Sequence, residues 1–379
     1  VDGDVAPTLA AGNPNSLLHV DRAEIGLLPD VSPYSDAVYE KARENFVRFQ
    51  SQGVLQREAR PCLYLYQQHM GAHVQTGIAA TCHGDDYDAG LIKKHEKTRP
   101  DKEDDRTRLI GTLRADTGPV FLTYRDRPGI DTLATAVAKE LPLYDFTAPD
   151  GIRHIVWRIE ETSEIVWQFA ALPWAYVADG HHRTASAVRV GRELREMNPN
   201  HTGAEAYNWF LAVLFPASQL QILPYNRVVK DLNGYTPDSM LGEIRRRFTV
   251  TSNAAATPSR PGHISMYLAG TWYGLAWEPE PTATPIGKLD VTGLQEKLLA
   301  PILGIDDPRT SKRIDFIGGI RGSQELVQLV DRGAGAVAFS MYPTTVDQLM
   351  DIADAGEIMP PKSTWFEPKL RSGLFNHTF

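Results

Sequence analysis

Residues 179–183 read Asp-Gly-His-His-Arg and combine one carboxylate with three side chains that can contact an anion. Apolar residues at 174–178 predict a short buried strand before this run, and 184–197 has helical periodicity. The run is therefore expected at a strand-to-helix turn. There the first helix amides are unpaired and the positive end of the helix dipole faces outward, which favours an anion such as phosphate.

The side chains of this turn suggest different roles. The expected phosphate contacts are Gly180, His181, Arg183 and Thr184. Asp179 would repel an anion, so we expect it to bind Mg²⁺ or to accept a proton from an attacking hydroxyl, with His182 as a second catalytic group. The alternative is structural: Asp179 caps the helix and the two histidines make local hydrogen bonds.

A second polar segment, expected as a loop, spans residues 84–108. Its His-Glu-Lys-Thr run at 95–98 resembles the zinc peptidase pattern HExxH, but Arg99 stands where the second histidine is required. Glu96 remains a candidate base and Arg106 a candidate phosphate-binding cation. We assign His95 and Thr98 to substrate binding. A solvated charged loop is the competing interpretation.

Two further motifs could contact ligands. Residues 360–364, Pro-Pro-Lys-Ser-Thr, place a cation and two hydroxyls after a stiff segment, although the glycines of a nucleotide-binding P-loop are missing. The expected phosphate contacts here are Lys362, Ser363 and Thr364. A polar cluster after an apolar pair is expected to bind substrate, and consists of Tyr225, Asn226 and Arg227. Simple solvation of these side chains is an alternative.

Periodicity predicts an α+β fold with mixed sheets. Helices are expected at 39–52, 131–140, 163–172 and 184–197, and strands at 62–67, 74–81, 120–124, 154–159, 174–178, 210–215, 221–227, 248–252, 263–268 and 271–277. We expect three regions that pack together: 1–130, 131–235 with the turn, and 236–379. The Pro- and Thr-rich stretch 279–285 is the expected linker.

Composition limits the classes of partner. The 379 residues carry a formal net charge of -8, and no run of Lys and Arg predicts contact with nucleic acid or membrane lipid. The apolar stretch 210–216 is far shorter than the roughly 20 residues of a membrane span, and no signal sequence is evident, so a cytoplasmic location is expected. Cys62 and Cys82 cannot build a disulfide framework. Homo-oligomerisation is left open.

The four motifs occur in an order that resembles the bacterial domain-of-unknown-function family 1015, over nearly the whole chain. The resemblance is strengthened by 301–305, 313–319 and 366–370. Members of that family usually begin with an apolar strand and a Pro-Pro-Tyr-Asp segment. No counterpart precedes residues 13–16, so any site residue from that segment is expected to be missing from this sequence.

The Asp-Gly-His-His-Arg run is also similar to the turn of ParB nucleotide-binding domains, sulfiredoxin and ParB-like free-serine kinases. This resemblance implies a ParB/sulfiredoxin-like core in which His181, His182 and Arg183 contact phosphates and Asp179 lies near the metal or the hydroxyl. It also implies an upstream glutamate as base, for which Glu96 is the candidate. Some members of family 1015 resemble kinases of free serine that use pyrophosphate.

We therefore expect a Mg²⁺-dependent phosphotransferase acting on a small hydroxylated metabolite. L-Serine is the favoured acceptor, and pyrophosphate or a nucleotide is the expected donor. Two alternatives remain: a ParB-like nucleotide-binding switch that forms no product, and a metal-dependent phosphohydrolase that releases phosphate without an acceptor.

Overall fold

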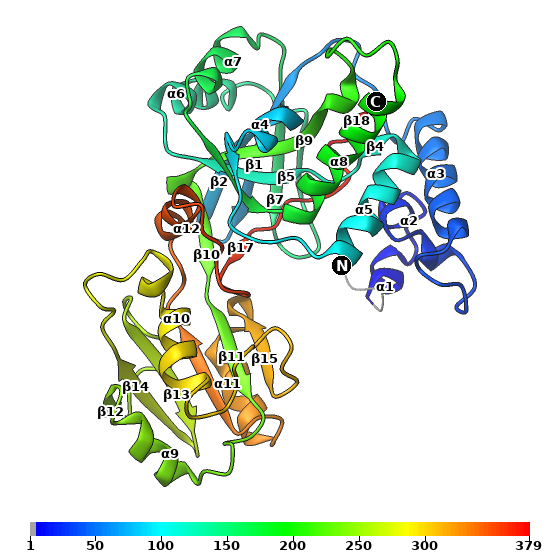
Figure 1. The fold of residues 1–379 in the computed structure, drawn as a ribbon. Helices are drawn as coiled ribbons and strands as arrows, with labels where there is room; N and C mark the ends of the chain where they lie inside the picture. The colour runs from blue at the N-terminus through cyan, green and yellow to red at the C-terminus, as the bar shows by residue number, and fades with distance from the viewer. Residues whose placement is uncertain (1–4) are drawn as a thin grey trace. The chain divides into compact units, whose positions relative to one another are not determined.

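The computed structural model describes residues 5–379, which divide into two compact units. The first unit contains the chain up to Gln219 together with the C-terminal segment Pro368–Phe379, and the second contains Leu220–Glu367. Both units combine helices with mixed or antiparallel sheets, so the predicted α+β class is confirmed (Figure 1).

An eight-stranded mixed sheet forms the centre of the first unit, in the order β3-β8-β5-β9-β2-β1-β7-β6. The pairs β3–β8 and β5–β9 are parallel, and the other neighbours are antiparallel. The strands are β1 (Leu63–Met70), β2 (His73–His83), β3 (Ile92–Lys93), β5 (Val120–Tyr124), β6 (Tyr144–Thr147), β7 (Arg153–Ile159), β8 (Ala175–Asp179) and β9 (Trp209–Pro216). A separate small sheet pairs β4 (Ala115–Asp116) with β18 (His377–Thr378).

The first unit also contains helices, some of which pack on the sheet and some on α5. They are α1 (Ala6–Ala10), α2 (Leu18–Asp21), α3 (Asp36–Ser51), α4 (Gly84–Asp88), α5 (Pro100–Leu113), α6 (Pro128–Val137), α7 (Ser163–Ala170) and α8 (His181–Met197). Helices α3 and α8 both pack on α5 (Figure 1). Helices α6 and α7 bury Leu133, Val137 and Phe169 against one sheet face, whose apolar side chains include Leu65 and Trp157.

The opposite face of strands β1 and β2 is covered by the C-terminal segment. Phe375 packs on Tyr64 and Tyr66, with ring centroids 5.1 and 5.5 Å away. The side chains of Gln68 and Gln75 are buried on this face, and Gln68 Nε2 donates to the backbone oxygen of Lys369 at 2.9 Å. The segment is therefore fixed to the sheet by both apolar and polar contacts.

The second unit is built on a six-stranded antiparallel sheet in the order β12-β14-β13-β16-β11-β15. Its strands are β11 (Tyr225–Val229), β12 (Thr249–Ser252), β13 (His263–Leu268), β14 (Thr271–Ala276), β15 (Ile314–Gly318) and β16 (Val337–Met341). A short pair joins β10 (Gln221–Leu223) to β17 (Trp365–Glu367). The helices are α9 (Pro237–Ile244), α10 (Asp290–Leu294), α11 (Gly322–Asp331) and α12 (Val346–Asp354).

Several expected elements differ from the structure. The expected loop 84–108 contains α4 and the start of α5, because Pro100 begins a helix whose apolar residues Leu109 and Leu113 are buried. The expected strand 221–227 is two strands separated at Pro224, which lacks an amide hydrogen. Residues 279–285 lie inside the second unit and do not link units.

The region boundaries also fall elsewhere than expected. The boundary at 130/131 lies inside α6, and strands from both expected regions share the eight-stranded sheet. The chain passes from the first unit to the second at 219/220, ahead of the expected boundary at 235/236, and returns to the first unit at 367/368. Strand pairing over long sequence distances sets these limits, and a local sequence pattern does not reveal it. Among the described residues, no helix has the length and apolar character needed to traverse a lipid bilayer.

Candidate functional site

The predicted strand-to-helix turn is present in the first unit. Strand β8 ends at Asp179, Gly180 is the N-cap with φ = 98°, and α8 begins at His181. The first backbone bond of the helix runs from Thr184 N to Gly180 O at 2.9 Å. The amides of residues 181–183 precede that bond and form the open first turn of the helix.

The backbone conformation at position 180 favours glycine. Its positive φ lies in the left-handed region, which disfavours side chains with a Cβ. A Cβ at this position would also come within 3.0 Å of Arg183 Nε. The Arg183 side chain therefore folds back over the turn and lies close to the backbone of Gly180.

Asp179 forms an ion pair that the sequence analysis did not predict. Its Oδ2 accepts a hydrogen bond of 2.9 Å from Lys369 Nζ, and its side chain is 37% exposed. Burial opposes ionisation, but the charges of Lys369 and Arg183 outweigh it and lower the pKa of Asp179 to about 2. The carboxylate is therefore ionised at neutral pH.

Arg183 provides the second cation at the turn. Its Nη1 lies 3.4 Å from the position that a Cβ of Gly118 would occupy, and no carboxylate within the described part of the chain forms an ion pair with it. Burial lowers the pKa of Arg183, while the nearby Asp179 opposes that shift. Arg106 is near enough to contribute a further repulsive positive charge. A half-buried guanidinium beside another cation is favourable when an anion can bind between them.

His181 is also buried, with 4% of its surface exposed. Its Nδ1 lies 3.7 Å from Glu96 Oε2, and its Nε2 has no hydrogen-bond partner among the residues described. The ring meets that of His95 edge to face, with centroids 4.4 Å apart. The structure thus brings His95 and Glu96 to the turn, as the proposed catalytic arrangement requires.

The two neighbouring histidines are neutral at pH 7. Burial lowers the pKa of His95 to about 4, and burial together with the charge of His95 moves the pKa of His181 well below its ordinary value. Neutral imidazole can donate one hydrogen bond and accept another. His181 is therefore suited to polar contact, and the formal positive charges come from Arg183 and Lys369. Glu96 is the accessible acid beside it, with a side chain that is 57% exposed.

Three other predicted residues make contacts that organise the backbone. His182 Nε2 accepts a hydrogen bond from Arg99 N at 3.0 Å. Thr98 Oγ1 donates to Glu103 Oε2 at 2.7 Å, and Thr184 Oγ1 donates to Gly180 O at 3.1 Å. The first two bonds connect the segment that carries Glu96 to α8 and α5, and the third lies within the first turn of α8.

Six predicted ligand contacts belong to the second unit: Tyr225, Asn226, Arg227, Lys362, Ser363 and Thr364. They form a local cluster, in which Arg227 Nη2 donates to Lys362 O at 3.1 Å and Asn226 Oδ1 accepts from Met341 N at 3.0 Å. Ser363 Oγ donates to Pro360 O at 2.6 Å. Burial lowers the pKa of Arg227 to about 10. These bonds are to backbone atoms, so they support a structural role; the ligand contacts of the six residues remain predictions.

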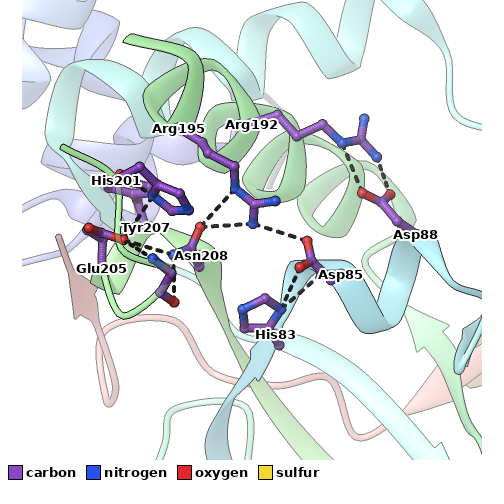
Figure 2. Close-up of polar contacts among 10 residues, drawn as sticks. His83, Asp85, Asp88, Arg192, Arg195, His201, Glu205, Tyr207 and Asn208 are labelled. Carbon is purple, nitrogen blue, oxygen red and sulfur yellow. Dashed lines mark hydrogen bonds and ion pairs between the residues drawn. The ribbon is translucent and has the colours of Figure 1, made fainter. Parts of the chain in front are cut away.

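The far end of α8 has a different arrangement (Figure 2). Arg195 donates to Asn208 Oδ1 and to Asp85 Oδ1, both at 3.0 Å, and Arg192 pairs with Asp88. Glu205 accepts hydrogen bonds from the Thr202 and Gly203 amides at 2.7 and 2.9 Å. This network connects the C-terminal part of α8 to α4 and to the loop before β9. It lies at the opposite end of the helix from the Asp179–Arg183 turn.

Comparison with known families supports the resemblance seen in the motifs. The sequence profile of the family described as "Protein of unknown function (DUF1015)" matches residues 1–292. The chain belongs to this family. The DUF1015 match includes Glu96 and the whole turn, whereas Lys362 and Lys369 lie beyond it. No curated protein has significant sequence similarity to the chain.

Solved structures show distant similarity to this DUF1015 chain. A "Free serine kinase in complex with AMP" has 12% identity and a TM-score of 0.37, covering 76% of this chain and 86% of its own. "SbnI with C-terminal truncation from Staphylococcus aureus" has 13% identity and a TM-score of 0.39, with coverages of 78% and 85%. A "Conserved hypothetical protein from Pyrococcus furiosus" has 12% identity and a TM-score of 0.38, with coverages of 78% and 93%.

Lys369 is the main site residue missed from the sequence. It lies 190 positions after Asp179, and the sequence analysis assigned it no role at the turn. Its only sequence signal is its place in the 366–370 segment that strengthens the family resemblance. The contacts of Gln68 with the C-terminal backbone, which place Lys369 beside β8, have no local sequence signature.

Proposed function

We propose that the N-terminal turn of α8 transfers a phosphoryl group to a small hydroxylated metabolite. The observation that carries this proposal is the meeting of two cations, Arg183 and Lys369, with an open helix N-terminus at one ionised carboxylate. Phosphoryl transfer depends mainly on positioning and on neutralising negative oxygen atoms. Those are the functions that this group of residues can supply.

Some of these residues would contact the phosphate donor, and others would contact the hydroxyl group that accepts the phosphate. Arg183, Lys369 and the amides of residues 181–183 would hold the negatively charged oxygens of the donor. Glu96 would accept the proton of the acceptor hydroxyl, since its exposed carboxylate lies beside His181. His181 would orient that carboxylate or donate a hydrogen bond to the transferring group through its neutral ring.

Mg²⁺ fits this site as a cofactor bound together with the donor. Among residues 5–379, no group of three or more His, Cys, Asp or Glu side chains is arranged to hold a metal ion. Mg²⁺ is commonly held by only one or two carboxylates plus waters and substrate phosphates. Asp179 could supply one such ligand through Oδ1, because Lys369 engages Oδ2. Bound Mg²⁺ would neutralise phosphate charge.

L-Serine is the favoured acceptor, and pyrophosphate or a nucleotide is the favoured donor. This choice rests on the similarity between the Asp-Gly-His-His-Arg turn and that of ParB-like free-serine kinases. A carboxylate base beside a cationic turn that binds phosphate is compatible with a primary alcohol acceptor. The donor and the acceptor can be tested separately, because donor binding and product formation are measured by different methods.

Purified protein should be incubated with Mg²⁺, L-serine and either pyrophosphate or ATP, with products identified by mass spectrometry and phosphorus NMR. We expect phosphoserine from the wild type and at least about 100-fold less from Asp179→Asn, because the substitution removes the charge that orients the cations and metal. The control Asp88→Asn, in α4, removes the partner of Arg192 away from the turn and should retain wild-type turnover. Circular dichroism should show that both variants are folded.

The outcomes separate the competing functions. Saturable nucleotide binding without any phosphorylated product would favour a ParB-like switch. Phosphate release that is independent of serine would favour a phosphohydrolase. Wild-type product formation by folded Asp179→Asn would contradict the proposed role of the turn.

A further inference from the structure

A cavity lies on the face of the central sheet that α6 and α7 cover. It has a volume of about 250 Å³ between α6 and strands β1 and β2. Its apolar wall includes Leu65, Ile78 and Ala134, and its polar wall includes Gln67 and Asp131. This volume is slightly below the roughly 300–1,000 Å³ of pockets for drug-sized ligands, so it suits a small molecule.

The cavity is separate from the α8 turn. Tyr124 lines the cavity at the last position of β5, whereas Phe121, near the start of the same strand, pairs with Asp179. Gln67 and Thr76 face the cavity, and the next residues on the two strands, Gln68 and Gln75, face the C-terminal segment. A ligand here would therefore bind at the other end of β5 from the turn.

The cavity carries negative charge without a basic partner. Asp131 lies in the first turn of α6, and no ion pair to its carboxylate occurs within residues 5–379. Asp126 is close enough to repel it, and Asp126 Oδ1 accepts a hydrogen bond from Ser218 N at 3.1 Å. Burial, followed by the charge of Asp126, raises the pKa of Asp131. A positively charged ligand would relieve this unfavourable pairing.

An unpaired hydroxyl on a buried side chain provides an independent sign of a ligand. Tyr124 has only 1% of its surface exposed, lines the cavity, and its hydroxyl receives no hydrogen-bond partner from the described residues. Burial raises the pKa of Tyr124, so the hydroxyl stays protonated and can both donate and accept. Buried polar groups normally have partners, and an N–H group of a ligand would supply one here.

We propose that this cavity is a second binding site, for a small primary amine. Its ammonium group would lie near Asp131 and Tyr124, and its alkyl part would pack on Leu65, Ile78 and Ala134. Asp126 would add long-range attraction. The assignment does not depend on the phosphotransferase proposal, because no residue is shared between the two sites.

The test uses n-butylammonium chloride as the probe, with saturation-transfer NMR and calorimetry on the full chain at constant ionic strength. Saturable binding is expected for the wild type. Asp131→Asn should weaken it by about 10-fold or more, since it removes a charged hydrogen-bonding partner. The matched control is Asp347→Asn, which removes an exposed carboxylate from the first turn of α12 and should leave the affinity unchanged.

A second pair of measurements tests shape and charge separately. Neutral n-butanol should bind much more weakly than the amine, and Ala134→Leu, which fills part of the cavity, should reduce amine binding while the thermal melt still shows a folded protein. Equal binding of butanol and amine, an unchanged affinity in Asp131→Asn, or no saturable binding to the wild type would each overturn the proposal.

Discussion

The two ends of α8 use similar residue types in opposite ways. At the far end, Arg195 and Arg192 are paired with Asn208, Asp85 and Asp88. At the N-terminal end, Arg183 has no ion pair among the described residues, and His181 Nε2 is buried without a partner. Completed polar contacts stabilise a structure, whereas buried polar groups that lack partners are suited to receive a ligand.

Arg183→Gln tests this difference with the largest expected effect. Loss of the guanidinium should lower phosphotransfer by roughly 100-fold, because a charge-assisted contact to the phosphate in the transition state is removed. The matched substitution Arg192→Gln, at the far end of the helix, should change turnover by less than about twofold. Steady-state kinetics with each donor would check both values. Equal losses in the two variants would remove the functional distinction between the ends.

Lys369→Met should have the next largest effect, about a 10-fold loss of phosphotransfer. It should also raise the pKa of Asp179 from about 2 toward its ordinary value, since the ammonium group that stabilises the carboxylate is removed. Carbon-detected NMR titration of the Asp179 carboxyl would measure that change. Lys230→Met, which breaks a pair with Asp315 in the second unit, is the control. An unchanged Asp179 titration would contradict the ion pair.

The buried histidines should make stability depend on pH. The folded pKa of His95 is about 4, below its ordinary value of 6.5, so the unfolded chain binds the proton first as pH falls. The free energy of unfolding should therefore decrease from about pH 6.5 toward pH 4, by up to about 1.4 kcal/mol per pH unit for this group. Urea unfolding should show a shallower dependence in His95→Gln. Identical pH slopes would argue against a buried neutral His95.

Arg195→Ala should have the smallest effect, and on stability alone. It leaves Asn208, which is buried, without its Arg195 donors and should lower the free energy of unfolding by about 1 kcal/mol. Phosphotransfer per folded molecule should stay at the wild-type level. Thermal unfolding and kinetics on the same preparation would check this. A large fall in turnover without a loss of stability would show that this end also contributes to catalysis.

The sequence predicted the turn best, because its reactive residue types and the strand and helix signals lie next to one another in the chain. A short apolar run, the Asp-Gly dipeptide and a helical period predicted β8, Gly180 and α8, because each signal acts over a few residues. The expected proximity of Glu96 to the turn, which came from the family resemblance, is also present. The role of either residue in catalysis stays a prediction.

Features that depend on distant pairing could not be predicted in the same way. Lys369 reaches Asp179 because contacts such as those of Gln68 and Phe375 hold the C-terminal segment on the sheet. The contact of His182 Nε2 with Arg99 N was likewise not predicted, and the catalytic role expected for His182 stays a prediction. The division at 219/220 likewise follows from strand order, which apolar periodicity does not encode.

The most direct test of the account is a titration of isotopically labelled protein with pyrophosphate and Mg²⁺, followed by amide NMR. We predict saturable shifts of the His181, His182 and Arg183 amides, with little change at Thr202 and Gly203 at the far end of α8. An absence of saturable shifts at residues 181–183, or equal shifts at both ends of the helix, would contradict a phosphate site at this turn.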